Sequence, residues 1–245
     1  MTDFDPAQYR VLVVDDSDVL LEAVDATLSR AGFQVSTAIS GEEAQALIKK
    51  RGLPHLAIVD INMPFGMDGF EFCEWVHEFS DLPIIMLTAV DEGDTIIDAI
   101  EQFAEDYITK PFGTGELVAR VRRVLRRIGD FAYELDVPIQ VDERLSVDFA
   151  AYQARLEGRS VTLSPTETKL LYILMRSSGR TVATDFLLRR LWPNEVVYED
   201  RLRVYIHRLR QKIETTPTQP RYIISHRGTG YAFLGGTDAS LGEVA

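Results

Sequence analysis

The chain has 245 residues, of which 46% are hydrophobic, and a formal net charge of −12 at pH 7. This length predicts one or two domains, and this composition excludes a largely disordered protein. Cys73 is the single cysteine, which excludes an internal disulfide and favours a reducing compartment. The chain opens without the basic and apolar segments of a signal peptide, and no apolar run is long enough to span a bilayer. We therefore expect a cytoplasmic protein with no membrane partner.

The charge is unevenly distributed between the two halves of the chain. Residues 1–135 carry 11 Lys+Arg against 25 Asp+Glu, a net charge of −14. Residues 136–245 carry 15 Lys+Arg against 13 Asp+Glu, a net charge of +2. Local charge governs a docking surface more than total charge does. The acidic total therefore leaves nucleic acid open as a partner of the second half.

The first half alternates apolar runs of strand length with amphipathic runs of helical length. The predicted strands are 9–14, 33–38, 56–60, 83–88 and 106–109, and the predicted helices are 19–30, 42–50, 69–79, 93–102 and 115–127. This alternation predicts an α/β doubly wound fold, with a five-stranded parallel sheet covered by helices on both faces. In such sheets, binding residues gather at the carboxyl ends of the strands.

The alternation stops near 129–136, where a domain boundary is expected. Short strand-like runs follow between 137 and 163, and helices are predicted at 166–177, 184–192 and 199–214. Ser164, Pro165 and Glu167 fit the N-cap, first helical position and third position of a capping box. The segment 222–233 predicts a hairpin.

Chemically suitable side chains stand at the carboxyl ends of four of the strands predicted in the first half. They are Asp15 and Asp16, then Asp60, Thr88 and Lys110. Crowded carboxylates repel one another and favour a hard divalent cation such as Mg²⁺. A carboxylate beside Mg²⁺ can attack a phosphoryl group and form an aspartyl phosphate. Lys110 would supply positive charge and Thr88 a hydroxyl donor to the phosphoryl oxygens.

Each of these aspartates has an ordinary structural explanation, because aspartate favours turns and helix caps. Turn preference alone does not explain suitable residues at the ends of four strands. The carboxylate, lysine and hydroxyl set therefore favours a chemical site over four unrelated turns.

Four motifs resemble the receiver domain of bacterial response regulators: Val13-Val14-Asp15-Asp16, Val59-Asp60-Ile61-Asn62-Met63-Pro64, Leu87-Thr88-Ala89 and Tyr107-Ile108-Thr109-Lys110-Pro111-Phe112. The resemblance implies a flavodoxin-like fold in which Asp60 accepts a phosphoryl group from a sensor histidine kinase. It implies that Asp15, Asp16, Asp60 and the Asn62 backbone carbonyl hold Mg²⁺. It also implies that Thr88 and Tyr107 form a switch pair that reorients on phosphorylation.

The helix predicted near 200–214 has two kinds of face. Leu202, Ile206, Leu209 and Ile213 recur at helical spacing and predict a buried stripe. The remaining surface suits the major groove and phosphates of DNA, and its candidate contacts are Arg201, Arg203, Val204, Tyr205, His207, Arg208 and Arg210. Taken alone, an arginine-rich helix is more often a solvated surface.

The segment Ile224-Ser225-His226-Arg227-Gly228-Thr229-Gly230-Tyr231 resembles the wing of the OmpR/PhoB-type winged-helix domain. Ser164–Leu174 resembles its first helix, and Arg208-Leu209-Arg210 its recognition helix. The resemblance implies an α+β winged helix-turn-helix domain that binds double-stranded promoter DNA, with Arg227 in a minor groove. It implies RNA polymerase contact at 193–199. One residue fewer than usual precedes Arg208, so base-contact roles transfer more directly to Arg208 than to Arg201 and Val204.

The receiver resemblance also implies a symmetric homodimer on activation. The candidate interface residues form an apolar patch and two ion pairs: Ile97, Ile100 and Val118, with Asp106 and Arg120, and Glu105 and Arg123. Exposed ion pairs contribute only about 0–1 kcal/mol each, so these would set register more than affinity.

The predicted organisation is a receiver domain at 1–128, a linker at 129–135, a winged-helix domain at 136–236 and a flexible tail at 237–245. The predicted function is phosphorylation-dependent regulation of transcription in a two-component system, not enzymatic turnover. One alternative is a receiver that acts without phosphorylation, because the loop after Asp60 carries one residue more than usual at Phe65-Gly66. Another is a metal-dependent phosphatase, but the sequence lacks the acid/base residue and cap that such enzymes need.

Overall fold

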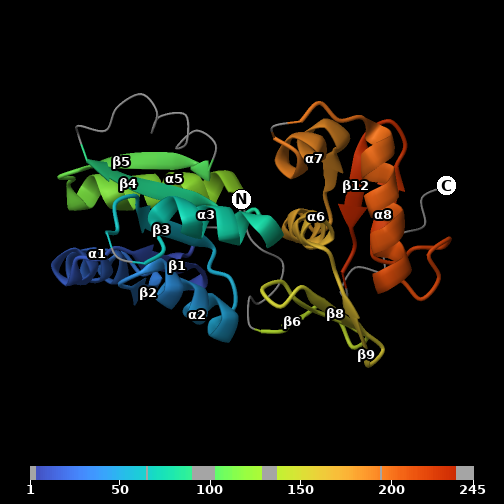
Figure 1. Cartoon of the computed structure of the whole chain (residues 1–245), viewed down its shortest axis with the longest axis horizontal. Coiled ribbons are helices and arrows are strands. Elements are labelled where there is room, and N and C mark those ends of the chain that lie inside the picture. Colours follow the sequence, from blue (N-terminus) through green and yellow to red (C-terminus); the bar gives the residue numbers. More distant parts are fainter. Residues whose placement is uncertain (1–3, 65, 90–102, 129–136, 194, 236–245) are drawn as a thin grey trace. The chain divides into compact units, whose positions relative to one another are not determined.

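The computed structural model describes residues 4–64, 66–89, 103–128, 137–193 and 195–235. The chain folds into two compact units whose main boundary in the sequence follows Asp130 (Figure 1). In the described ranges, no helix is both long and apolar enough to cross a membrane. The helix predicted at 93–102, the linker predicted at 129–135 and the tail predicted at 237–245 lie outside these ranges.

The N-terminal unit contains a five-stranded parallel sheet in the order β2-β1-β3-β4-β5. The strands are β1 (Arg10–Val14), β2 (Gln34–Ala38), β3 (Leu56–Asp60), β4 (Ile84–Ala89) and β5 (Asp106–Lys110). The central strand β3 is buried along its whole length, as expected for a parallel strand covered on both faces. This topology confirms the predicted doubly wound α/β fold.

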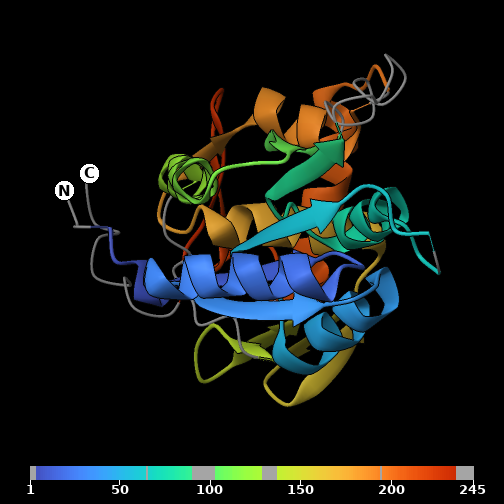
Figure 2. The same ribbon diagram turned by 90° about the vertical axis from the view of Figure 1, so that its left-hand side faces the viewer.

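Helices cover both faces of this sheet. They are α1 (Asp18–Arg30), α2 (Gly41–Arg51), α3 (Gly69–Phe79) and α5 (Thr114–Ile128), and a short 3-10 helix η1 (Pro6–Gln8) precedes β1. Figure 2 shows α5 on one side of the strands and α2 and α3 on the other. Apolar side chains of α1 and α5, including Leu21 and Val121, share one core cluster with Val13 and Ile58 of the sheet.

Local signals explain where these helices begin. The Ser17 hydroxyl accepts from the Leu20 backbone N–H at the start of α1, and the Ser40 hydroxyl accepts from the Glu43 N–H at the start of α2. The strand order changes direction between β1 and β3. The carboxyl ends at such a switch point form a crevice in which ligands bind. The sequence therefore places Asp15, Asp16 and Asp60 at this edge.

The C-terminal unit begins with an antiparallel sheet in the order β6-β7-β8-β9. Its strands are β6 (Ile139–Gln140), β7 (Leu145–Asp148), β8 (Gln153–Leu156) and β9 (Arg159–Thr162). The helices α6 (Pro165–Arg176), α7 (Thr184–Leu191) and α8 (Glu199–Ile213) follow and pack on one another (Figure 1). A second sheet has the order β10-β12-β11, from Thr181–Ala183, Gly230–Phe233 and Ile223–His226.

Three sequence predictions about this unit are confirmed. The capping box is present, with the Ser164 hydroxyl accepting from the Glu167 N–H and the Glu167 carboxylate accepting from the Ser164 N–H. The predicted apolar stripe of α8 is buried in full. β11 and β12 form the predicted hairpin. Gly230 is required there, because a Cβ at this position would lie 1.9 Å from the Val182 carbonyl oxygen.

Candidate functional site

Three aspartates meet at the carboxyl ends of β1 and β3. These strands are neighbours in the sheet, with Val14 opposite Val59, so Asp15 and Asp16 lie beside Asp60. One oxygen of each carboxylate lies within 4.8 Å of the others. Asp15 and Asp60 are buried, whereas Asp16 is exposed. The cluster therefore opens to solvent on the side of Asp16.

Lys110, the last residue of β5, joins this cluster. Its Nζ lies 2.8 Å from Asp15 Oδ2 and 2.9 Å from Asp60 Oδ1. Burial opposes the charge of Lys110, but the hydrogen bonds to both carboxylates outweigh burial and raise its pKa. The peptide bond from Lys110 to Pro111 is cis. Lys110 thus bridges two carboxylates from the end of β5, which β4 separates from β3.

The Asp60 carboxylate is not fully compensated by Lys110. Burial raises its pKa, Lys110 lowers it, and the charges of Asp15 and Asp16 raise it further, with a raised pKa as the net result. Three close carboxylates against one ammonium leave excess negative charge. An all-oxygen, acidic and partly open donor set fits a hard divalent cation with several bound waters, as Mg²⁺ prefers.

Thr88 and Tyr107 occupy the two strands beside the cluster. Thr88 is 6% exposed, near the end of β4, and its hydroxyl donates to the Ala89 carbonyl oxygen at 2.9 Å. Tyr107 is on β5, opposite Met86 of β4, and is 54% exposed. The hydroxyl of Thr88 is thus engaged locally, while the side chain of Tyr107 lies largely in solvent.

Gly69 is a site residue that sequence reasoning missed. It begins α3, and its N–H donates to the Ile61 carbonyl oxygen at 3.3 Å. A Cβ at Gly69 would lie 2.1 Å from the Asp60 carbonyl oxygen, so only glycine allows this close approach. The sequence feature that could have pointed to Gly69 is a glycine nine residues after the candidate acceptor, at the start of a predicted helix. Asn62 lies on the exposed loop between these anchors.

The proposed interface residues of the receiver form ion pairs within one chain. Asp106 pairs with Arg120 at 3.1 Å and with Arg123 at 2.6 Å. Glu105 pairs with Arg127. Arg120 also pairs with Glu116 at 2.8 Å. The pairs predicted across a dimer are Asp106 with Arg120 and Glu105 with Arg123, and these contacts within one chain leave that expectation a prediction.

Of the apolar residues predicted for that interface, the structure describes Val118. Val118 is half-buried, packs against the core cluster and lines a groove with Thr27 and Arg30 of α1. It therefore lies on the side of α5 that faces α1. Ile97 and Ile100 lie outside the described residues.

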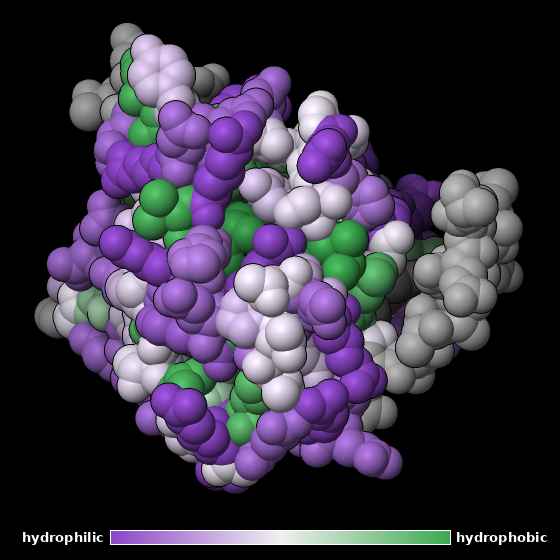
Figure 3. Space-filling model, turned by 90° about the vertical axis from the view of Figure 1, so that its right-hand side faces the viewer, coloured by the Kyte–Doolittle hydropathy of each residue, from purple (hydrophilic) through white to green (hydrophobic). Residues whose placement is uncertain are grey.

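Helix α8 exposes the side of its surface opposite the buried stripe. Arg203, Val204, His207 and Arg208 are exposed. Tyr205 is half-buried and packs against Trp192, with ring centroids 5.3 Å apart. Figure 3 shows this side of the molecule, where polar side chains dominate and apolar patches are small and separate. Such a surface suits a polar, charged partner more than an apolar one.

Two arginines near the start of α8 already have partners. Arg201 pairs with Glu195, and its guanidinium lies 4.6 Å from the centre of the Trp192 ring. Arg203 pairs with Glu199 at 2.9 Å and with Asp200 at 3.2 Å. Arg208 lies 5.7 Å from the Tyr205 ring centre, and no ion pair of Arg208 occurs among the described residues. Arg208 is therefore the freest of these cations to meet a phosphate or a base.

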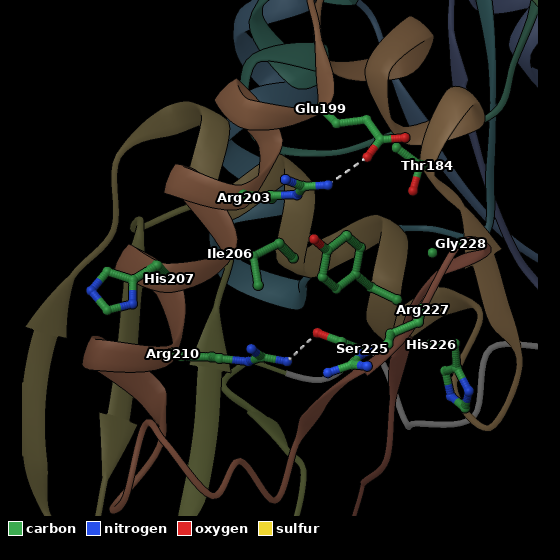
Figure 4. Close-up of a pocket in the computed structure, with 12 residues that line it drawn as sticks. Thr184, Glu199, Arg203, Ile206, His207, Arg210, Ser225, His226, Arg227 and Gly228 are labelled. Carbon is green, nitrogen blue, oxygen red and sulfur yellow. Dashed lines mark hydrogen bonds and ion pairs between the residues drawn. The ribbon is translucent and has the colours of Figure 1, made fainter.

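A groove of about 360 Å³ separates α8 from the β11–β12 hairpin. Figure 4 shows its walls, with Arg203, His207 and Arg210 from α8 and His226 and Arg227 from the hairpin. Arg227 is exposed at the hairpin turn.

Arg210 joins the two walls of this groove. Its guanidinium donates to the Ile223 carbonyl oxygen at 2.6 and 3.0 Å and to the Ser225 hydroxyl at 2.9 Å (Figure 4). Burial lowers the pKa of Arg210. This side chain, predicted as a DNA contact, thus holds the hairpin against the helix.

Glu214 is a second clamp, and sequence reasoning missed it. Its buried carboxylate accepts from the backbone N–H groups of Arg221, Tyr222 and Ile223 at 2.8–2.9 Å. A glutamate directly after a helix interacts unfavourably with the helix dipole. This position is the sequence feature that could have pointed to a structural role for Glu214. Arg210 and Glu214 together fix the hairpin relative to α8.

Comparison with known proteins identifies both units. The family described as response regulator receiver domain matches residues 11–122, and the family described as transcriptional regulatory protein, C terminal, matches residues 158–233. The DNA-binding response regulator MtrA of Mycolicibacterium smegmatis is 36% identical over 229 residues, which are 93% of this chain and 97% of MtrA. The sensory transduction protein RegX3 of Mycobacterium bovis is 34% identical over 226 residues, covering 92% of this chain and 99% of RegX3.

A solved structure is also similar to this chain. The response regulator DrrB of Thermotoga maritima, an OmpR/PhoB homolog, is 29% identical, with coverage of 93% of this chain and 100% of DrrB and a TM-score of 0.43. The two family matches and the full-length relatives agree on the arrangement of the chain. The protein belongs to the response regulators that join a receiver domain to an OmpR/PhoB-type DNA-binding domain.

Proposed function

We propose that Asp60 accepts a phosphoryl group from a sensor histidine kinase and that this modification controls binding to promoter DNA. The observation that carries the proposal is the buried Asp15–Asp60–Lys110 constellation, open to solvent beside Asp16. Asp15, Asp16, Asp60 and the Asn62 backbone carbonyl would hold Mg²⁺, which neutralises phosphoryl oxygens when bound.

Each side chain has a separate part in the transfer. An Asp60 oxygen forms the new P–O bond while the P–N bond of a phosphohistidine donor breaks, and the imidazole keeps the electron pair. Lys110 is close enough to exchange its Asp60 contact for a phosphoryl oxygen. Lys110 retains Asp15 as a partner in either state. Positioning and charge neutralisation therefore supply most of the catalysis.

The switch is proposed to run through Thr88 and Tyr107. Thr88 would release the Ala89 carbonyl oxygen and donate to a phosphoryl oxygen. Tyr107 would then turn from solvent toward the space that Thr88 leaves. A phosphoryl group carries about −1.5 to −2 charges at pH 7 and replaces the single charge of the Asp60 carboxylate. The added charge and the new acceptor oxygens are proposed to bias two packings of β5 and its neighbours.

DNA contact is proposed at the groove between α8 and the hairpin. Arg208 and Val204 would meet base edges, Arg201, Arg203, Tyr205 and His207 would meet the backbone or flanking bases, and Arg227 would enter a minor groove. Arg210 is assigned mainly to holding the hairpin, because its guanidinium is engaged there. RNA polymerase is proposed to contact 193–199.

The proposed domain bounds are 1–128 for the receiver and 136–236 for the DNA-binding domain. On activation, receivers would form a homodimer that uses Asp106, Arg120 and neighbouring residues. A dimer doubles the DNA contacts and selects paired half-sites. We place this activity in the cytoplasm, where kinase and promoter are both accessible.

Intact-mass measurement after exposure to Mg²⁺ and acetyl phosphate tests the acceptor. We expect one phosphoryl adduct on the wild type and none on Asp60→Ala, while Asp18→Ala, on the exposed first turn of α1, keeps the adduct. No adduct on the wild type, or an adduct that persists in Asp60→Ala, would refute the assignment.

The extra residue at Phe65-Gly66 supports one second candidate, a receiver that acts without phosphorylation. DNA affinity of the wild type before and after adduct formation separates the two. An adduct that leaves DNA affinity unchanged favours the second candidate.

A further inference from the structure

The loop that follows Asp60 is fixed at its base. The Ile61 N–H donates to the Leu87 carbonyl oxygen of β4 at 3.2 Å, and the Gly69 N–H returns to the Ile61 carbonyl oxygen at 3.3 Å. The Met63 side chain is buried. These contacts close the loop beneath the exposed Asn62, which lies two residues from the acceptor.

The other end of the loop rests on the first turn of α2. The Met67 N–H donates to Glu42 Oε1 at 2.8 Å. Gly66 has a φ of +80°, and a Cβ there would lie 2.5 Å from the same carboxylate oxygen. Both the conformation and the close approach require glycine at this position. Glu42 therefore contacts the loop at two consecutive residues.

Neighbouring residues of α2 extend this contact. A Cβ at Gly41 would lie 2.6 Å from Met67 Cγ, so the missing side chain makes room for Met67. Gln45 Nε2 donates to Met67 Sδ at 3.4 Å. Backbone hydrogen bonds from Glu42 itself and from Met67 lower the pKa of Glu42, so its carboxylate is ionised at neutral pH. A charged acceptor forms a stronger hydrogen bond than a neutral one.

We propose that Glu42 is a positioning residue for the phosphoacceptor site, holding the loop so that the Asn62 carbonyl is preorganised for Mg²⁺. The inference rests on the proposed function of Asp60. It also explains the sequence around the additional loop residue, because Gly66 adopts a left-handed conformation and packs against Glu42. Outer residues that orient metal ligands typically change metal affinity 10–100-fold when removed.

The test is Mg²⁺ affinity of the full chain without a phosphodonor, read from amide shifts of the ¹⁵N-labelled protein. We expect Glu42→Ala to weaken Mg²⁺ binding about tenfold and to reduce adduct formation by acetyl phosphate at subsaturating Mg²⁺. Saturating Mg²⁺ restores adduct formation, because Asp60 itself is intact. Glu42→Gln keeps an acceptor oxygen and stays within about twofold of the wild type.

Glu43→Ala is the matched control. Glu43 lies on the same turn, but its carboxylate accepts from the Ile39 N–H at 2.9 Å and caps α2 rather than the loop. We expect it to lower thermal stability while leaving Mg²⁺ affinity unchanged. Wild-type Mg²⁺ affinity in Glu42→Ala, or an equal loss in Glu43→Ala, overturns the inference while Asp60 remains the acceptor. A wild type that binds no Mg²⁺ and forms no adduct overturns the proposed function and this inference with it.

Discussion

At the scale of residues, the site holds charges that the fold alone would avoid. Asp15 and Asp60 are buried side by side, and Lys110 compensates only part of their charge. Close like charges that remain buried are typical of functional sites, where local stability is exchanged for binding or reactivity. Burial and the neighbouring carboxylates together raise the pKa of Asp60.

This raised pKa predicts that Asp60→Asn stabilises the protein when Mg²⁺ is absent. A carboxyl with a raised folded-state pKa favours folding at low pH and loses that contribution as pH rises through the folded-state pKa. We therefore expect Asp60→Asn to be more stable than the wild type at pH 7, by on the order of 1 kcal/mol. The difference should shrink on acidification toward the usual aspartate pKa of about 3.9.

Urea unfolding at a series of pH values measures this difference. Asp18→Asn, at an exposed position outside the cluster, should stay within about 0.5 kcal/mol of the wild type. Added Mg²⁺ should stabilise the wild type and leave Asp60→Asn nearly unchanged, because only the wild type keeps the full carboxylate set. Equal stability of wild type and Asp60→Asn at every pH would show that the buried charge carries no penalty.

At the scale of elements, the second domain is held together by polar links between its helices and hairpin. Glu167 accepts from the Ser164 N–H at 2.7 Å and from Lys212 Nζ of α8 at 2.6 Å. Arg210 and Glu214 attach the hairpin to α8. Charged groups on the inward side of α8 and at its end thus fix the surface proposed to contact DNA.

Loss of the Glu167 side chain should therefore cost more folding stability than loss of the Ser164 cap. Ser164→Ala removes one capping hydrogen bond and should cost about 1 kcal/mol. Glu167→Ala also leaves Lys212 with the Thr162 carbonyl as its remaining partner, and should cost about 2 kcal/mol, since Lys212 is one-third exposed. Chemical denaturation of the two variants gives the comparison, and an equal cost would assign Glu167 to capping alone.

Substitutions of Arg208 and Arg210 should differ in their effect on folding stability. Arg208→Ala removes an exposed cation, so we expect DNA affinity to fall by about 1–3 kcal/mol while unfolding changes by less than about 0.5 kcal/mol. Arg210→Ala should lower both, because it frees the hairpin. Fluorescence anisotropy with promoter DNA and urea unfolding provide the two readings. Unchanged stability in Arg210→Ala would return this residue to the DNA contacts.

The sequence predicts elements better than it predicts these links. Hydrophobic periodicity and the length of the apolar runs predict β3 and α3 at their observed bounds. The Ser164 capping box is predicted as well, because it involves residues only three positions apart. Arg210 and Glu214 act through residues 7–15 positions away, which no local pattern specifies. Likewise, the order of the strands explains why Asp15 and Asp60 lie together. The hydrogen bond between Glu42 and Met67 joins residues 25 positions apart and depends on side-chain geometry.

At the scale of the whole molecule, the two halves carry opposite net charge, −14 for residues 1–135 and +2 for 136–245. The first half adds little attraction for DNA, so the proposed contact depends on the second half, whose net charge is only +2. A monomer with so little net positive charge should bind DNA weakly at physiological salt. Joining two chains multiplies affinity through effective concentration, which supports dimerisation as the proposed point of control.

We therefore expect beryllofluoride with Mg²⁺, a mimic of the phosphorylated state, to convert the full chain from monomer to dimer. Sedimentation at tens of micromolar protein reads the change, and Asp60→Ala should stay monomeric. Asp106→Ala removes the shared partner of Arg120 and Arg123, whose guanidinium groups are partly exposed. It should therefore weaken the proposed dimer about tenfold or less, as expected for ion pairs worth about 1 kcal/mol. Because such pairs are screened, the difference between wild type and Asp106→Ala should narrow as salt is raised. A wild type that stays monomeric with beryllofluoride would contradict control by dimerisation, and a salt-independent difference would assign Asp106 to the fold of the receiver instead.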